Sequence, residues 1–385
     1  MDFDWSAADR AYRERIRAFL ERELPADWAR LSREGPGSKA VTDFSREFCP
    51  KLAAEGLLVP HWPAEWGGAD RPTWEHFILG EEMWAANEPR GAQYMNVNWI
   101  GPTLMRFGSP EQKARYIPPM AQGRAIWCQG FSEPDAGSDL AALRTRAERD
   151  GDDYVIDGTK IWTSYAGLAD TCFLLARVPG EGGGGKSAIV ILLVPMDTPG
   201  IEVRPIPSLI GRGDIHETFF SDVRVPASAR LGEEGQAWSI ISYALANERV
   251  GIPRYELGAE VLAETVRQLK AQGRFDDPVV QSRAGAASAA CEAARMLVHR
   301  VVDQRARGLP PGPESNIARV AVIGAEHAVT DFAADFLPEA FSGDAHPLIQ
   351  AHHERAIVAG IAAGAAEIQL NLIASRHLNL PRETS

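Results

Sequence analysis

Residues 127–140 read WCQGFSEPDAGSDL, and residues 157–170 read DGTKIWTSYAGLAD. Each stretch has the pattern of a β-strand that runs into a turn, with serine, threonine or glycine at the bend. Such bends expose backbone N–H groups and hydroxyls, which can bind the polar edge of a ring or a phosphate group. Either stretch alone is better explained as an ordinary capped turn, so its meaning depends on the sequence around it.

That surrounding sequence predicts a β domain. Between residues 123 and 231 apolar and polar residues alternate, and β-branched residues become more frequent. No helical pattern separates the strands, so a sandwich or barrel is favoured over a sheet built from βαβ units. The expected strands are 153–158, 171–178, 188–194 and 217–225.

Helices are expected on both sides of this domain. Apolar residues recur at helical spacing before it, and long alanine-rich segments after it indicate a helical bundle. The expected helices are 9–24, 42–55, 73–84, 110–121, 236–252, 254–271, 278–307, 314–336 and 346–377. The predicted fold class is α+β, with an N-terminal all-α domain (1–122), a middle β-sandwich or barrel (123–231) and a C-terminal four-helix bundle (232–385).

Composition excludes several classes of function. The chain has 385 residues and a net charge of −12, which disfavours nucleic acid and anionic membranes as partners. The four cysteines are far apart, so neither a disulfide framework nor a metal site is expected. The N-terminus lacks the pattern of a signal peptide, and polar residues interrupt the apolar stretch 356–375. We therefore expect a cytoplasmic protein with no membrane span.

One glycine-rich motif is interpreted as a coincidence. Residues 180–187 read GEGGGGKS and satisfy the phosphate-loop pattern. That motif needs a helix after it, whereas the following residues predict a strand. The tip of a hairpin is the better interpretation.

Taken together, the two opening stretches resemble the flavin-contacting signatures of the acyl-CoA dehydrogenase family, usually written TEPGAGSD and KxWITN. The predicted order of helical, β and helical domains also matches the fold of that family. The resemblance extends to residues 60–68, 108–116, 219–226 and 367–369.

The resemblance implies FAD-dependent α,β-dehydrogenation of an acyl-CoA to a trans-2-enoyl-CoA. In the family FAD lies against the β domain and the C-terminal helices. A carboxylate removes the α-proton while a hydride passes to the flavin, and the electrons usually leave to an electron-transferring flavoprotein. Two alternatives stay open: a non-catalytic or half-site subunit, and another flavin reaction on this fold, such as that of an oxidase or monooxygenase.

Binding residues follow from the resemblance by position. Ser132 and Ser164 stand where the family usually has threonine, and each keeps the hydroxyl. The expected cofactor-binding residues are Gln129, Phe131, Ser132, Gly137, Ser138, Trp162, Ser164 and Glu367. The expected substrate-binding residues are Ser138, Arg249, Ala363 and Gly364.

The catalytic base is expected at an unusual place. Many members carry it just before the final EIQ-like segment, where this chain has Ala363, which has no proton acceptor. Isovaleryl-CoA and long-chain members instead place a glutamate, followed by arginine, on an earlier helix, and Glu248 and Arg249 match that position. Helical spacing puts Glu248 on the apolar face with Ile241 and Ala244, where a poorly solvated carboxylate suits proton abstraction. A glutamate that merely pairs with an arginine in the bundle is the alternative.

Departures from the family concern the contacts that one subunit lends to its neighbour's flavin. Residues 272–276 read QGRFD where homotetrameric members usually have RxxFG, and the usual QxxGG segment is replaced near residues 337–343. In lacking these two segments, the chain resembles bacterial two-gene members of the family, many of which act on sterol side chains. The expected assembly is therefore a homo-tetramer or a hetero-tetramer with a sister subunit, and the expected acyl group is bulky, branched or long.

Overall fold

The strands of the computed structural model form one seven-stranded sheet in the middle of the chain. The structure describes residues 5–180, 185–209, 213–249, 253–309, 312–342, 345–362 and 364–381, without side chains for residues 246–249. The chain folds into two compact units. We call them the sheet unit (Glu34–Ala69 and Arg90–Asn247) and the helical unit (Met1–Arg33, Asp70–Pro89 and Glu248–Ser385).

The sheet unit is built on strands in the order β1-β4-β2-β3-β7-β6, with β5 paired to β4. The β4–β2 junction is a single register pair, Arg146 with Arg177, so the sheet has two parts joined at a narrow point. Side chains from both parts, such as Leu174 and Ile156, share one buried cluster. The described strands are β1 (Trp127–Gly130), β2 (Arg146–Asp150), β3 (Asp153–Ser164), β4 (Thr171–Arg177), β5 (Ile189–Pro195), β6 (Ile201–Pro205) and β7 (Ile215–Pro226).

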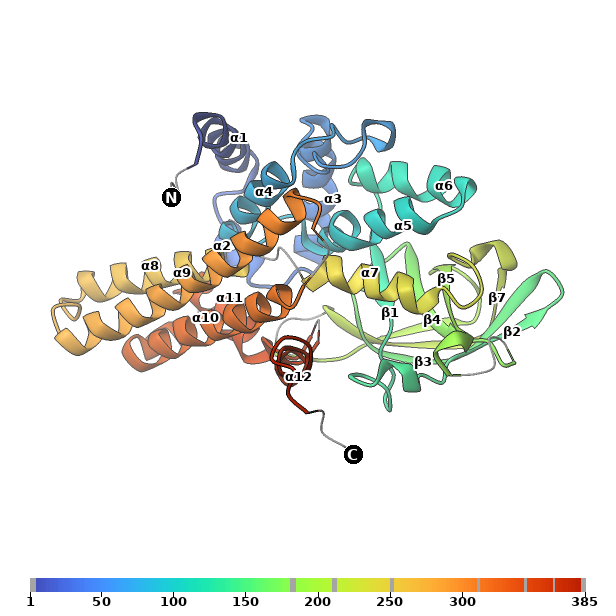
Figure 1. The fold of residues 1–385 in the computed structure, drawn as a ribbon. Coiled ribbons are helices and arrows are strands. Elements are labelled where there is room, and N and C mark those ends of the chain that lie inside the picture. The colour runs from blue at the N-terminus through green and yellow to red at the C-terminus, as the bar shows by residue number, and fades with distance from the viewer. Residues whose placement is uncertain are drawn as a thin grey trace. The chain divides into compact units, whose positions relative to one another are not determined.

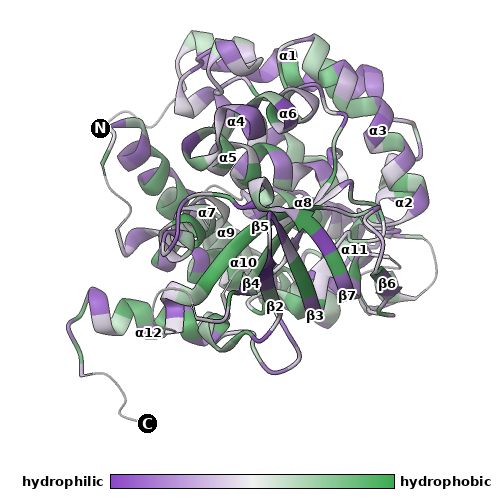
Figure 2. Ribbon diagram, turned by 90° about the vertical axis from the view of Figure 1, so that its right-hand side faces the viewer, coloured by the Kyte–Doolittle hydropathy of each residue, from purple (hydrophilic) through white to green (hydrophobic). Residues whose placement is uncertain are grey.

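Hydrophobic patterning explains which strands lie deepest. β5 is apolar throughout, β4 is apolar between Thr171 and Arg177, and both faces of each strand are buried. β7 alternates between buried and exposed residues, and Figure 2 shows the corresponding hydrophobic and hydrophilic bands. β3 continues to Ser164, past the expected end at Gly158, because register shifts on either side of Lys160 let the strand bend without ending.

Helices of the sheet unit fix the start of β1. Gln112 in α6 donates from Nε2 to the carbonyls of Ser228 and Arg230, both at 2.8 Å, and the Tyr116 ring meets that of Trp127 at 5.1 Å. The Tyr116 contact ties α6 to β1, which carries the first opening stretch, and the Gln112 bonds tie α6 to the segment that follows β7. The unit's α-helices are α3 (Lys39–Ala54), α5 (Gly101–Phe107), α6 (Pro110–Ala121) and α7 (Ala237–Arg249), the last of which ends two residues beyond it.

The helical unit contains segments from both the N-terminal and the C-terminal parts of the chain. Figure 1 shows α8, α9 and α10 lying side by side as long antiparallel helices. The helix expected over 346–377 is two helices, because Gly360 and Gly364 have φ angles of 86° and 88°, which no helix continues. The unit's α-helices are α1 (Ala7–Glu23), α2 (Trp28–Ser32), α4 (Thr73–Ala85), α8 (Arg254–Ala271), α9 (Pro278–Ala306), α10 (Glu314–Phe336), α11 (Pro347–Val358) and α12 (Ala366–Arg376).

The predicted fold class is confirmed: helical, β and helical regions follow one another along the chain. Within the described residues, no helix is long and apolar enough to cross a bilayer.

A buried ionic cluster holds α1 and α8 against α4. Glu81 accepts from Arg13 at 2.5 Å, from the Tyr255 hydroxyl at 2.8 Å and from His299 Nε2 at 3.0 Å. Burial works to raise the pKa of Glu81, but His299 and Arg13 outweigh it and lower that pKa. Glu256 has no such hydrogen bond among the described residues, and burial, followed by repulsion from Glu81, raises its pKa to about 8.

Replacing this second carboxyl should stabilise the chain at alkaline pH. The folded chain holds the Glu256 proton more tightly than the unfolded chain, so the carboxyl's contribution to stability is full at low pH and is lost as pH rises through about 8. We expect Glu256→Gln to raise the unfolding free energy by about 2 kcal/mol at pH above 8 and to change little below the usual carboxyl pKa.

Denaturant unfolding at two pH values measures this difference. Glu260→Gln is the control, because Glu260 is exposed on the same helix and its replacement should change stability by less than about 0.5 kcal/mol. A Glu256→Gln variant that is less stable than wild type at alkaline pH would contradict the assignment.

Candidate functional site

The two opening stretches lie side by side where β1 ends and β3 bends. The Ser132 carbonyl accepts a hydrogen bond from the Ile161 N–H at 2.9 Å. The preceding carbonyl, of Phe131, accepts from Lys160 Nζ at 3.1 Å. The Phe131 ring also meets the Phe173 ring of β4 at 5.9 Å. The two opening stretches are therefore joined by hydrogen bonds and lie next to each other in the sheet unit.

A buried ion pair lies at this junction. Lys160 Nζ is 2.7 Å from Glu133 Oε1, and the two side chains are 0% and 7% exposed. Burial lowers the pKa of Lys160 to about 8, although Glu133 works against this shift. Burial also acts to raise the pKa of Glu133, but the Lys160 ammonium outweighs it, so that pKa is lowered. The pair is thus charged at neutral pH.

The loop after β1 is held near both ends. At the first end, Glu133 and Ala136 exchange two backbone hydrogen bonds, of 2.9 and 3.1 Å. At the other end, Arg177 donates to the carbonyls of Ala141 at 2.7 Å and Leu143 at 3.1 Å. Gly137 and Ser138 are exposed between these ties, and nothing lies within 4 Å of a Cβ added at Gly137. The loop therefore presents a small, open bend that suits a phosphate or a ring edge.

Trp162 has an unusual backbone conformation for its size. Its φ angle is 59°, in the left-handed region that bulky residues seldom adopt, and its side chain is 57% exposed. The bulge between Lys160 and Thr163 produces this conformation. The strand is fixed again after it, since Tyr165 N donates to the Asp214 carbonyl at 2.9 Å. An exposed indole held in a strained position is typical of a functional site.

These residues fit a flavin. The exposed Trp162 indole offers an apolar face for a ring, and the half-buried Ser132 and Ser164 offer hydroxyls at either side of the junction. Gln129 and Phe131 are half-buried on the same strand end, and Gly137 and Ser138 are exposed on the loop beside it. The two stretches that carry these seven residues meet at the hydrogen bonds of Phe131 and Ser132, and the roles of the residues in binding a cofactor stay predictions.

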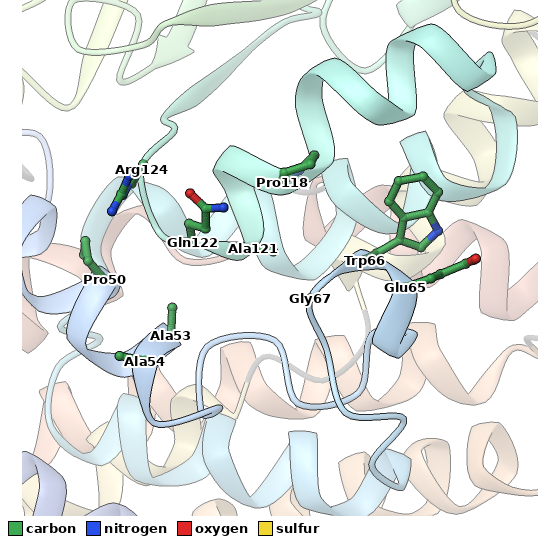
Figure 3. A pocket seen from close by; sticks show the side chains of 10 residues that line it. All are labelled: Pro50, Ala53, Ala54, Glu65, Trp66, Gly67, Pro118, Ala121, Gln122 and Arg124. Carbon is green, nitrogen blue, oxygen red and sulfur yellow. The ribbon is translucent and has the colours of Figure 1, made fainter.

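Among the described residues, the hollows of the sheet unit include a pair of particular interest. Figure 3 shows one of about 410 Å³ among α3, η1 (Ala64–Trp66) and α6, and none of the predicted site residues lines it. The other, of about 610 Å³, is lined by residues of the second stretch from Ala166 to Asp170 and includes His216. His216 Nδ1 lies 3.3 Å from the Thr163 carbonyl, and burial lowers its pKa. Only the second hollow adjoins the site.

The remaining described candidates belong to the helical unit. Gly364 precedes α12 with a left-handed φ of 88°, and Glu367 is exposed in the first turn of that helix. The buried Gln369 donates to the Gly364 carbonyl at 3.3 Å, which holds this entry to the helix.

Three candidates are not described in full. Glu248 and Arg249 are the last two residues of α7, and their side chains lie outside the described residues. Ala363 lies outside the described residues altogether. Their roles stay predictions.

Sequence reasoning did not single out Lys160 and Glu133. The signal was present, because alternation along β3 assigns Tyr154, Ile156 and Lys160 to the buried side. A lysine at such a position needs a carboxylate partner. The carboxylate of the first opening stretch that lies nearest to β1 is Glu133.

Comparison with known protein families finds matches along most of the chain. Residues 6–124, 128–223 and 235–378 match, in order, the N-terminal, middle and C-terminal domains of acyl-CoA dehydrogenases. Acyl-CoA dehydrogenase IpdE1 of Mycobacterium tuberculosis is 33% identical over 386 residues, which cover 97% of this chain and 98% of that protein.

Two solved structures are similar over the whole chain. The "Tcur3481-Tcur3483 steroid ACAD" is 31% identical with a TM-score of 0.89, and the match covers 100% of both chains. The ChsE4-ChsE5 complex from Mycobacterium tuberculosis is 25% identical with a TM-score of 0.86, again over 100% of both chains.

Proposed function

Since the chain belongs to the acyl-CoA dehydrogenase family, which uses FAD, we propose that it oxidises the α,β-bond of an acyl-CoA to give a trans-2-enoyl-CoA. The observation that carries the proposal is the junction of the two signature stretches, with its exposed, strained Trp162. FAD, when bound, accepts the hydride that leaves the β-carbon.

The chain's own residues would bind, polarise and deprotonate. Trp162, Ser132 and Ser164 would hold the flavin ring, with Gln129 and Phe131 beside it, and the bend at Gly137 and Ser138 would face phosphates. The Glu248 carboxylate would take the α-proton, and its removal requires that the thioester carbonyl be polarised. Alanine at position 363 removes only a side chain, so a backbone donor to that carbonyl is retained.

We further propose a bulky or branched acyl group and a partner subunit. The similar structures include a steroid enzyme and the ChsE4-ChsE5 complex, which supports a hetero-tetramer with a sister chain over a homo-tetramer. Exposed apolar residues on and after α11 and on α12, namely Ile357, Ile361 and Leu370, suit an interface. Electrons would pass to an electron-transferring flavoprotein. None of the described cysteines forms a disulfide and all are buried, which suits the cytoplasm.

Anaerobic titration with acyl-CoA thioesters tests this function. We expect a branched or steroid-side-chain acyl-CoA to bleach the visible flavin absorbance and to yield the enoyl product, whereas free CoA should do neither. The chain is purified both alone and with the product of a neighbouring gene. Full FAD occupancy and turnover by the chain alone would contradict the sister-subunit proposal.

Two outcomes would favour the other readings. Oxygen consumption without an enoyl product would favour an oxidase or monooxygenase. Absence of FAD from the chain, even with its sister subunit, would favour a non-catalytic subunit and overturn the proposed function.

A further inference from the structure

Lys160 and Glu133 form a buried ion pair in the sheet unit, where the two opening stretches meet. Their side chains are shielded from solvent, so neither is placed to contact a ligand directly. Lys160 is 0% exposed and Glu133 is 7% exposed. Removing two charges from water costs more than their attraction commonly returns, and apolar residues of similar size are often as stable. A role in stability therefore does not explain the pair, and its hydrogen bonds indicate another.

Lys160 fixes the orientation of the peptide group between Phe131 and Ser132, just after β1. Lys160 Nζ donates to the Phe131 carbonyl, and Ile161 N donates to the next carbonyl, that of Ser132. Both carbonyls therefore face β3. Described peptide bonds are all trans, so the Ser132 N–H points opposite to the Phe131 carbonyl, away from the lysine. That N–H donates to no other group among the described residues.

The glutamate fixes the loop on the far side of the bend. Besides Lys160, Glu133 accepts from the backbone N–H groups of Arg144 at 2.5 Å and Thr145 at 2.9 Å. Its carboxylate thereby ties the start of the loop to its end. Gly137 and Ser138 lie between these ties and are exposed. The ion pair thus controls both the peptide before the bend and the shape of the bend itself.

We propose that Lys160 and Glu133 are positioning residues for FAD, which aim the Ser132 N–H and the bend at Gly137 and Ser138 at the cofactor. The proposal rests on the proposed function, because it assumes that these groups bind a flavin. The pair preorganises donors that would otherwise have to be ordered during binding, and this lowers the cost of association.

FAD titration of the FAD-free full-length chain, in the same assembly as wild type, tests the role. Lys160→Met keeps the length of the side chain but removes its donors. We expect the variant to bind FAD about 10- to 100-fold more weakly, because the Phe131 peptide is released and Glu133 loses its partner. Fluorescence of the free flavin measures the affinity without turnover.

A pH profile separates positioning from general damage. Without the ammonium, the buried Glu133 should take up a proton more readily, so the FAD affinity of Lys160→Met should recover as pH falls from about 8 to 6. The double variant Lys160→Met/Glu133→Gln should bind more tightly than the single variant and show no such profile. Wild type should be flat between about pH 7 and 6, because Lys160, whose pKa is about 8, keeps its proton there.

Other groups around the pair do not produce this profile. Cys172 lies opposite on β4, Arg144 pairs with Asp135 at the surface at 3.4 Å, and burial lowers the pKa of His216 on β7. All three are present in every variant, so their titration would appear equally in the double variant and in wild type.

Gln112→Met is the matched control. It also removes two side-chain bonds to backbone carbonyls in the sheet unit, but at the other end of β7, so it should lower thermal stability and leave FAD affinity unchanged. Wild-type affinity in Lys160→Met, or a double variant as weak as the single one, would overturn the positioning role. Failure of wild type itself to bind FAD would instead overturn the proposed function.

Discussion

Glu248→Gln should lower the rate at which an acyl-CoA bleaches the bound flavin about a thousandfold, while FAD remains bound. A general base commonly contributes a factor of about 10² to 10⁴, and glutamine keeps the size of the side chain but has no proton acceptor of comparable strength. Anaerobic stopped-flow absorbance measures the bleaching rate, and the visible spectrum of the purified variant reports FAD content.

The pattern of buried residues along α7 is the reason to expect the catalytic base at position 248. α7 extends from Ala237 to Arg249, and its buried residues include Ile240, Ile241 and Ala244. Helical spacing assigns position 248 to the stripe of Ile241 and Ala244, one turn further along. A carboxylate at such a position is a functional candidate because the helix gains no stability from placing it there.

A second substitution tests whether a carboxylate at position 363 can replace the one at position 248. Glu248→Gln/Ala363→Glu places a carboxylate at the position where many members of the family are expected to carry the base, and we expect part of the lost rate to return. The single substitution Ala363→Glu should leave the rate within about tenfold of wild type. Bleaching by Glu248→Gln at the wild-type rate would show that the proton leaves to another group.

Patterning made the strands and the domain order predictable. The strands expected at 171–178 and 188–194 are β4 and β5, because a run of β-branched and apolar residues between turns has few other solutions. The break between α11 and α12 was not predicted, since the alanine-rich stretch is compatible with one helix and only the two left-handed glycines end it. Long-range pairing, which fixes both β6 and the ends of β3, leaves little trace in local sequence.

The site was predictable to the extent that it depends on exposed residues. The two stretches meet at the hydrogen bond from Ile161 N to the Ser132 carbonyl, next to the exposed Trp162, while the roles of Ser132, Trp162 and Ser164 stay predictions. The buried support was not predicted, because pairing Lys160 with Glu133 requires knowledge that β3 passes beside the end of β1. Charged residues inside turn-rich motifs are easily interpreted as surface residues, and only the strand register shows that these two are buried.

Trp162 provides the second large expected effect. A left-handed backbone costs a bulky residue about 1 kcal/mol or more, and an indole that is 57% exposed returns little of this through burial. The folded chain alone therefore gives no reason for tryptophan here. A ligand ring that stacks on the indole would explain the tryptophan, because stacking on aromatic side chains contributes roughly 1–3 kcal/mol to binding.

Trp162→Gly should consequently separate binding from stability. We expect FAD to bind about 100-fold more weakly, because the stacking face is lost. The unfolding free energy of the FAD-free chain should fall by only about 1–2 kcal/mol, since glycine relieves the left-handed strain and offsets part of the lost burial. Trp66→Ala is the control: this half-buried tryptophan lines the hollow of Figure 3, away from the predicted site residues, so its loss should not change FAD affinity. Equal weakening by both substitutions would mean that the effect is general, and the strained indole would then have no role in binding the flavin.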